Sequence, residues 1–266
     1  MRICVLTVNH GTSAYAELLL ESLLHHHPGR DNLTVVVLDN QSDELDRLDR
    51  FRAAGVEIRQ SGYSTTAGLT THGEILRDAI LAAGEGDEFD AYLLVDCDVC
   101  FVADGTIDEL ARELEADRGA FAVQARWLTP DGSDFTGGAD ADRPVSLVRE
   151  SLRSLPDGEW SAPFEFAVEL QLDDRVHPFC ALIRNTPAFR ATVENLGLSP
   201  AMVQCERGGK WWDTLGLLTQ VMKTHGLTFR SSGQGVIHFG NVSWDPQWAA
   251  EKAAARDALL AKYTTV

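Results

Sequence analysis

Apolar runs that suit buried strands alternate with helical stretches along the first hundred residues, and this alternation constrains the fold more than any other feature. A strand is predicted at residues 2–8, a helix at 15–26 and a second strand at 33–38. The second strand is almost continuously apolar or β-branched, which is typical of a strand buried on both faces of a parallel sheet. Strands that alternate with helices form βαβ units with right-handed crossovers. The sequence therefore predicts an α/β fold: a mixed, mainly parallel sheet flanked by helices in a single compact domain.

The rest of the chain continues this pattern without a repeat or a linker that would separate independent domains. We expect the later strands to extend the same sheet. The C-terminal stretch is alanine-rich and helical, and it either packs on the core or forms the contact of a homodimer. The further elements that we expect are a strand at 56–58, a helix at 69–83, a strand at 92–95, strands at 164–172 and 179–183, and helices that start at 186, 215 and 246.

Composition limits the partners of the protein. The chain has 266 residues, 44% of them hydrophobic, and a formal net charge of −17. Such a charge repels phosphates, so it argues against nucleic acid and against an anionic membrane surface. A site for a negatively charged nucleotide must therefore supply its positive potential locally, for example through a divalent metal.

The sequence also indicates a cellular compartment. The apolar run at 3–8 is too short for a secretory signal and suits a first strand, and no run is long enough to span a membrane. Five cysteines, an odd number, fit a reduced compartment better than a disulfide framework. We expect a cytoplasmic protein without an integral membrane segment.

Two carboxylates end the predicted strand at 92–95. If the strand continued through Asp96 and Asp98, both side chains would point the same way, because alternate residues of a strand share a face. Two converging carboxylates repel each other unless a cation lies between them, and oxygen ligands of this kind suit Mg²⁺ or Mn²⁺. The alternative is an ordinary solvated turn. Asp39 also falls at a predicted strand end, and ligands of parallel sheets bind at this edge.

Other candidate sites were weighed against simpler interpretations. Cys97 and Cys100 form a C-x-x-C, but no second ligand pair has suitable spacing for zinc, and the nearby aspartates would raise the thiol pKa, so both are interpreted as core residues. The three histidines at 25–27 fan around a predicted helix end and more plausibly complement its dipole than share an ion. The chain has neither a P-loop nor a G-x-G-x-x-G after its first strand.

Short motifs in the order of the strands resemble a known family. They are Val8-Asn9 after the first strand, 39–42 (Asp-Asn-Gln-Ser) after the second, and Asp96-Cys97-Asp98. They resemble the GT-A (Rossmann-like) fold of the large group of inverting, nucleotide-sugar-dependent glycosyltransferases, in which Asp-x-Asp is a recurrent motif. The stretch 67–73 is similar to the family's glycine-bounded segment over the sugar nucleotide, and 236–243 resembles a His-x-Gly-Gly-x-Ser element of rhamnosyl-type members.

The resemblance implies roles for individual residues. Asp39 would accept a hydrogen bond from a uracil or thymine ring, although an ordinary helix N-cap is an equally good interpretation. A nucleotide-sugar donor would thus be a UDP or dTDP sugar. The residues that the resemblance assigns to the nucleotide are Thr7, Val8, Asn9, Asp39, Gly68 and Asp96. The residues that it assigns to a Mn²⁺ or Mg²⁺ cofactor are Asp96, Asp98 and His238.

The catalytic base is assigned by the same resemblance. Family members carry an acidic pair at the start of a late helix, and here the single Asp213 stands near that position. The departure leaves both the base and the inverting outcome open, and a helix N-cap is the simpler role for Asp213. Trp211 and Trp212 beside it offer flat faces on which an acceptor sugar stacks, although a core role for one of them is equally plausible.

The resemblance also implies a division of labour. Residues 1–127 would form the nucleotide-sugar-binding half and 128–266 the acceptor-binding half, with the Gly- and Asp-rich loop at 129–140 between them ordering when substrate binds. The acceptor hydroxyl belongs to a small molecule, a glycan or a peptide. Two alternatives stay open: a nucleotidyltransferase acting on a sugar phosphate, and a catalytically inactive module that binds nucleotide sugars.

Overall fold

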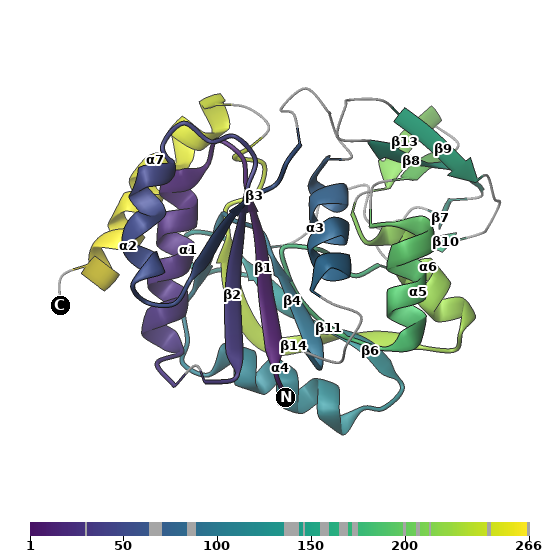
Figure 1. Ribbon diagram of the computed structural model, residues 1–266, viewed down its shortest axis with the longest axis horizontal. Helices are drawn as coiled ribbons and strands as arrows, with labels where there is room; N and C mark the ends of the chain where they lie inside the picture. Colours follow the sequence, from purple (N-terminus) through teal and green to yellow (C-terminus); the bar gives the residue numbers. More distant parts are fainter. Residues whose placement is uncertain are drawn as a thin grey trace.

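The structure of the protein is a computed structural model (Figure 1). Within 144–171 and 201–212 it describes the backbone alone. The residues that it describes are 1–29, 31–63, 71–83, 89–135, 144–145, 147–154, 160–164, 170–171, 175–198, 201–205, 208–212, 214–243 and 246–264.

Strands and helices alternate through the first half of the described chain, as the sequence predicts. The strands are β1 Ile3–Asn9, β2 Leu33–Asp39, β3 Glu57–Gln60, β4 Ala91–Val95, β5 Val99–Phe101, β6 Ala120–Leu128, β7 Pro144–Val145, β8 Leu147–Ser154, β9 Trp160–Phe164, β10 Leu170–Gln171, β11 Cys180–Arg184, β12 Ala201–Cys205, β13 Gly208–Trp212 and β14 Thr228–His238. The helices are α1 Ser13–His26, the 3₁₀ helix η1 Leu45–Leu48, α2 Asp49–Arg52, α3 Thr71–Ala82, α4 Thr106–Ala116, α5 Pro187–Leu196, α6 Gly216–Thr224 and α7 Pro246–Thr264.

The described residues form a central eight-stranded sheet with the order β3-β2-β1-β4-β11-β6-β14-β5. Its first four strands are mutually parallel, and β14 is parallel to β6. The strands β11 and β5 run antiparallel to their neighbours. The predicted fold class, a mixed and mainly parallel sheet flanked by helices, is confirmed.

Helices cover both faces of this sheet, and the strands are apolar on both sides for that reason. In β1, Ile3 and Val5 pack in a core with α1 and α4, whereas the alternate residues Cys4, Leu6 and Val8 pack with α3, α5 and α6. Figure 1 shows α1 on one side of the sheet and α3, α5 and α6 on the other. The continuous hydrophobic runs of the sequence are therefore the signature of a three-layer arrangement.

The sheet curls strongly at the end of β4. Three residues, Asp96 to Asp98, connect β4 to β5, although three other strands lie between these two in the sheet order. Four Cα steps reach at most about 14 Å, whereas four strand spacings in a flat sheet cover about 19 Å. The far edge of the sheet must therefore bend back towards the end of β4, and it brings the end of β14 with it.

One expected strand does not extend the sheet. Of residues 164–172, Phe164 ends β9, which belongs to a separate four-stranded antiparallel sheet, and Leu170–Gln171 pairs with β7. The remaining residues of that stretch lie outside the described ones. The prediction was wrong because period-2 alternation indicates a strand but does not indicate its partner. The strand at 179–183 was placed well, since β11 lies inside the central sheet.

The helices predicted to start at 186 and 246 are confirmed as α5 and α7. Thr186 caps α5, because its hydroxyl accepts a hydrogen bond from the backbone N–H of Phe189, and Pro187 occupies the first turn. The helix α7 packs on α1 and the end of β14 through a small hydrophobic core, so it does pack on the molecule; the homodimer stays a prediction. None of the helices in the described part of the chain combines the length and apolar character needed to cross a bilayer.

Candidate metal and nucleotide-sugar site

A pocket of about 600 Å³ opens at the carboxyl ends of β1, β2 and β4. The first half of the chain lines it with residues from β1, α3, the β4–β5 turn and β6. The second half contributes residues from the segments 175–179 and 238–243, and Thr214, two residues before α6. The carboxyl edge of a parallel sheet is where ligands of such folds bind, so this pocket is the candidate site.

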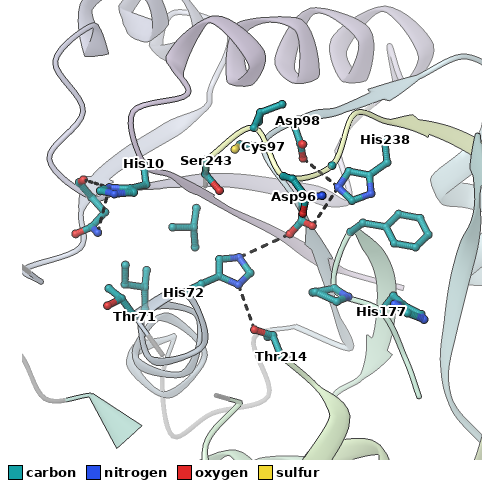
Figure 2. Close-up of a pocket in the computed structure, with 18 of the residues that line it drawn as sticks. His10, Thr71, His72, Asp96, Cys97, Asp98, His177, Thr214, His238 and Ser243 are labelled. Carbon is teal, nitrogen blue, oxygen red and sulfur yellow. Dashed lines mark hydrogen bonds and ion pairs between the residues drawn. The ribbon is translucent and has the colours of Figure 1, made fainter. Parts of the chain in front are cut away.

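Three potential metal ligands meet in this pocket. A carboxylate oxygen of Asp96, one of Asp98 and a ring nitrogen of His238 all lie within 4.8 Å of one another. The Nε2 atom of His238 is 3.1 Å from Asp98 Oδ1 and 3.4 Å from Asp96 Oδ2. Figure 2 shows the imidazole facing both carboxylates. We call these three residues the acidic cluster.

A turn, and not strand geometry, makes the two carboxylates converge. Residues 96–98 lie between β4 and β5, and the backbone N–H of Val99 donates to the carbonyl of Asp96, 3.2 Å away. The two carboxylates do converge, as expected. They converge because of this turn, and not because they are alternate residues of a strand. His238 is distant in the sequence and ends β14. Because β14 pairs with β5, His238 lies opposite Val99.

The acidic cluster concentrates negative charge. Asp98 is 5% exposed and His238 is 8% exposed. Burial lowers the pKa of His238, but the charge of Asp98 and the hydrogen bonds to Asp96 and Asp98 raise it to about 9. The negative charge of the two carboxylates thus favours a positive charge at this point of the molecule.

The donor set fits a divalent metal. Two carboxylates and one imidazole are ligands that Mn²⁺ accepts, and the three atoms are close enough together to hold one ion. Open positions would remain for the oxygens of a substrate, since only three protein ligands are present in this group. A Mg²⁺ ion, which favours oxygen ligands, is less well matched by the imidazole.

The described residues among those assigned to the nucleotide, which exclude Gly68, separate into two groups. Val8 and Asp96 line the pocket, whereas Thr7, Asn9 and Asp39 are buried behind its wall. Asp39 is 1% exposed.

The Asp39 carboxylate is held by protein donors. Its Oδ1 accepts from Asn9 Nδ2, 2.9 Å away, and its Oδ2 accepts from Ser42 N and Gln60 Nε2. We call these four residues the Asp39 cluster. The contact of Asp39 with a base stays a prediction, and the structure shows a carboxylate that closes the turn after β2.

Several predicted site residues cannot be placed. Asp213 and Gly68 lie outside the described residues, and of Trp211 and Trp212 the structure gives only the backbone, as the end of β13. The neighbour of Asp213, Thr214, does line the pocket. The assignments of catalytic base and acceptor platform therefore stay predictions.

A polar wall opposite the acidic cluster was not predicted from the sequence. His72 of α3 lies between Asp96 and Thr214, with Nε2 3.7 Å from Asp96 Oδ1 and Nδ1 3.5 Å from the Thr214 hydroxyl (Figure 2). Arg175 donates to the Thr214 carbonyl, and His177 also lines the pocket. His72 falls in the stretch that resembles the family's glycine-bounded segment, whereas no signal pointed to Arg175.

The candidate sites that the sequence analysis set aside are structural. Cys97 and Cys100 are buried free thiols, and burial raises the pKa of both. His26 contacts Asp104, whereas His27 donates from Nδ1 to the Leu23 carbonyl and accepts at Nε2 from the N–H of Ile107. The rings of His26 and His27 thus have different hydrogen-bonding partners.

The described part of the 129–140 loop is a closed turn. The Asp131 carboxylate accepts from the Thr129 hydroxyl and from the N–H and hydroxyl of Ser133, and the Thr129 bond is the main reason that its pKa falls to about 2. Phe135 then stacks on Trp127 at the pocket rim. Residues 136–140 lie outside the described ones, and the ordering of the loop on binding stays a prediction.

Comparisons with known proteins place this fold. No protein-family model and no curated protein sequence matches the chain. The mannosyltransferase PcManGT from Pyrobaculum calidifontis, solved with GDP-Man and Mn²⁺, is similar in structure with a TM-score of 0.52 and 15% identity over 98% of this chain. This chain covers 64% of the mannosyltransferase, less than two thirds of its length.

Two other solved structures agree. S. aureus TarS 1–349 matches with a TM-score of 0.52 and 14% identity, over 99% of this chain and 70% of TarS. The chain has the GT-A fold. Glucosyl-3-phosphoglycerate synthase from Mycobacterium tuberculosis, in complex with phosphoglyceric acid, matches with a TM-score of 0.50 and 18% identity, over 99% of this chain and 80% of the synthase. Identities this low support the fold and not a particular activity.

Proposed function

We propose that this protein is a metal-dependent glycosyltransferase that moves a sugar from a nucleoside-diphosphate sugar to an acceptor hydroxyl. The observation that carries the proposal is the convergence of Asp96, Asp98 and His238 in a pocket at the carboxyl edge of a GT-A sheet. A structurally similar mannosyltransferase was solved with GDP-Man and Mn²⁺, which supports a nucleotide-sugar donor and a manganese cofactor.

The acidic cluster would hold the metal. When bound, a divalent ion stabilises the negative charge that develops on a diphosphate leaving group. Asp96 and Asp98 would supply the carboxylates and His238 the neutral imidazole, so metal binding would compete with protonation of the ring.

A bound diphosphate would need more positive charge than the metal site supplies, and the polar wall would provide it. Two carboxylates cancel the charge of a divalent ion, so the metal site itself leaves the charge of a diphosphate unbalanced. Arg175, with His72 and His177 beside it, would supply the remaining positive charge and hydrogen-bond donors. This arrangement makes a binding site for nucleotide possible in a chain of net charge −17.

The acceptor would enter from the second half of the chain. The pocket takes its walls from both 1–127 and 128–266, which supports a donor half and an acceptor half of one domain. Asp213 stays the proposed base for the acceptor hydroxyl, with inversion as the expected outcome, and Trp211 and Trp212 stay the proposed acceptor contacts. The acceptor itself, whether small molecule, glycan or peptide, is open, and the cytoplasmic location stays a prediction.

The proposal is tested by thermal unfolding with UDP, dTDP, GDP and ADP, each with and without Mn²⁺. A ligand at 100 times its Kd stabilises the folded state by about 2.7 kcal/mol, which is an easily measured shift. We expect stabilisation by at least one diphosphate only when Mn²⁺ is present, with UDP or dTDP favoured if Asp39 contacts the base. No shift with any of the four would contradict the proposal.

Turnover separates an enzyme from an inactive binding module. With the donor identified, metal-dependent release of the nucleoside diphosphate, slow without acceptor and faster with it, is expected of a transferase. Binding without any release would favour the inactive module. Formation of a nucleotide sugar from a sugar phosphate would favour the nucleotidyltransferase.

A further inference from the structure

The ring of His238 lacks the support that a metal-ligating histidine commonly has. Such a ring usually donates its second N–H to a carboxylate or carbonyl, which fixes its orientation. The Nδ1 atom of His238 is buried and has no hydrogen-bond partner in the described structure. The ring instead stacks on Phe179, with ring centroids 5.1 Å apart and planes 12° apart, and leans on Trp127. Its position must therefore depend strongly on how the backbone is held.

The backbone around His238 is held from several sides. Trp127 Nε1 donates to the His238 carbonyl, 2.8 Å away, and the N–H of Phe239 donates to the Asp98 carbonyl, 3.1 Å away. Gly240, with φ of +68°, and Asn241, with φ of +59°, then adopt left-handed backbone conformations and lead into the turn at 242–243.

The C-terminal helix α7 closes this arrangement. Lys252 donates from Nζ to the Phe239 carbonyl, 2.6 Å away, and also to the Gly240 carbonyl, so one ammonium group bridges the two residues that follow the metal ligand. The helix is itself anchored, because the Tyr15 hydroxyl of α1 donates to the Ala249 carbonyl, 2.6 Å away. Figure 1 shows α7 lying along α1.

The ammonium of Lys252 also lies in the field of the acidic cluster. Burial lowers its pKa, and the charge of Asp98 acts in the opposite direction. A fixed positive charge near a metal site weakens metal binding by repulsion, whereas correct placement of a ligand strengthens it. The two effects of Lys252 on metal affinity thus have opposite signs, and a measurement can tell which one dominates.

We propose that α7 acts as a clasp for the metal site, in which Lys252 is a positioning residue that holds the turn after His238. Through the Phe239 and Gly240 carbonyls it sets the place where the imidazole meets Asp96 and Asp98. This inference rests on the metal site of the proposed function. It gives the helix α7 a role in metal binding that the sequence of the helix does not indicate.

The test is a Mn²⁺ titration of the 266-residue chain, followed by the electron paramagnetic resonance signal of free Mn²⁺. In Lys252→Met, which keeps the aliphatic stem and loses the donors, we expect Mn²⁺ affinity to fall about tenfold, as for other residues that orient ligands. Lys252→Arg, which keeps charge and donors, should restore most of the affinity. Lys262→Met removes the same charge from an exposed site on the same helix and should leave affinity unchanged.

Unfolding of the metal-free variants in urea separates positioning from stability. We expect the loss of Mn²⁺ affinity in Lys252→Met in samples that are fully folded before metal is added. If that variant does not fold, Lys252→Gln, which keeps an N–H donor for one carbonyl, should still bind Mn²⁺ more weakly than the wild type.

The failures are distinguishable. A wild type that binds no Mn²⁺ would overturn the metal site and the clasp together. A wild type that binds Mn²⁺, with folded Lys252 variants that bind it equally well, would overturn the clasp alone. Tighter binding in Lys252→Met would also overturn it, because repulsion would then be the main effect of the lysine.

Discussion

Two buried carboxylate clusters lie at the same edge of the central sheet, and they are satisfied in opposite ways. Asp39 is 1% exposed, and its oxygens accept hydrogen bonds from three neutral donors of the protein. Asp98 is 5% exposed, and it shares the imidazole of His238 with Asp96, which has His72 on its other side, 3.7 Å away. Both sites contain the same functional group in the same kind of location.

The two clusters differ in whether the protein itself compensates the negative charge of the carboxylates. A buried carboxylate surrounded by protein donors is complete, and it acts as part of the scaffold. Two carboxylates that share one ring have more negative charge than the protein compensates, so they favour an added cation. The comparison therefore predicts that changes in the acidic cluster affect ligand binding, whereas changes in the Asp39 cluster affect folding.

The largest effect is expected from Asp98→Asn. The loss of one charged ligand should reduce Mn²⁺ affinity at least about 100-fold, because removing a ligand costs more than disturbing its support. A Mn²⁺ titration measures this, with Asp31→Asn, an exposed site with the same charge change, as the control. An unchanged Mn²⁺ affinity would show that Asp98 is not a metal ligand and would contradict the contrast between the two clusters.

Asp39→Asn should act on stability instead. The new amide N–H₂ would face the N–H donors of Ser42 or Gln60, so the free energy of unfolding should fall by about 2 kcal/mol. Urea unfolding measures this change, and Mn²⁺ affinity should stay as in the wild type. A variant that keeps its stability but no longer binds UDP would show that Asp39 contacts the base, as the sequence suggests.

Gly240→Ala tests the turn beside the acidic cluster. A side chain at φ of +68° is strained by about 1–2 kcal/mol, and its Cβ would lie 3.2 Å from Cζ2 of Trp127. Gly226→Ala is the matched control, because it has φ of +74° and no atom within 4 Å of the added Cβ. Both variants should lose stability in urea, but only Gly240→Ala should also weaken Mn²⁺ binding. Equal Mn²⁺ affinity in the two variants would show that the turn does not support the site.

The smallest effect is expected at His27, a buried histidine whose neutral ring makes both of its hydrogen bonds. Burial lowers the pKa of His27, whose ring donates to one backbone group and accepts from another. Because the folded pKa lies below the unfolded one, this histidine destabilises the fold as pH falls below about 6.5, by at most about 1.4 kcal/mol per pH unit.

His27→Gln should therefore be less stable than the wild type at pH 8, by about 1 kcal/mol. That difference in unfolding free energy should shrink as pH falls from 7 to 5. Urea unfolding across this range is the measurement. A difference that stays constant with pH would show that the His27 ring does not resist protonation.

Local patterns in the sequence predicted much of the parallel half of the fold. The run at 33–38 predicted a buried strand and became β2, and the helical stretch at 15–26 became most of α1. These elements were readable because burial on both faces of a strand, or one face of a helix, leaves a period in the sequence. Asp96 and Asp98 were also found, because two carboxylates after an apolar run are a local signal.

The sequence by itself determined the strands of the parallel half, β1 to β4, and which strand end has a pair of carboxylates. Only the tertiary structure decided what surrounds that pair. A three-residue connection from β4 to β5 makes the sheet curl, and the pairing of β14 with β5 then brings His238 to Asp96 from 142 residues away in the chain. His72 and Arg175 enter the pocket from a helix and a loop in the same non-local way. Periodicity records whether a residue is buried, but it does not record which distant strand or helix buries it, because strand partners are chosen by the packing of the whole chain.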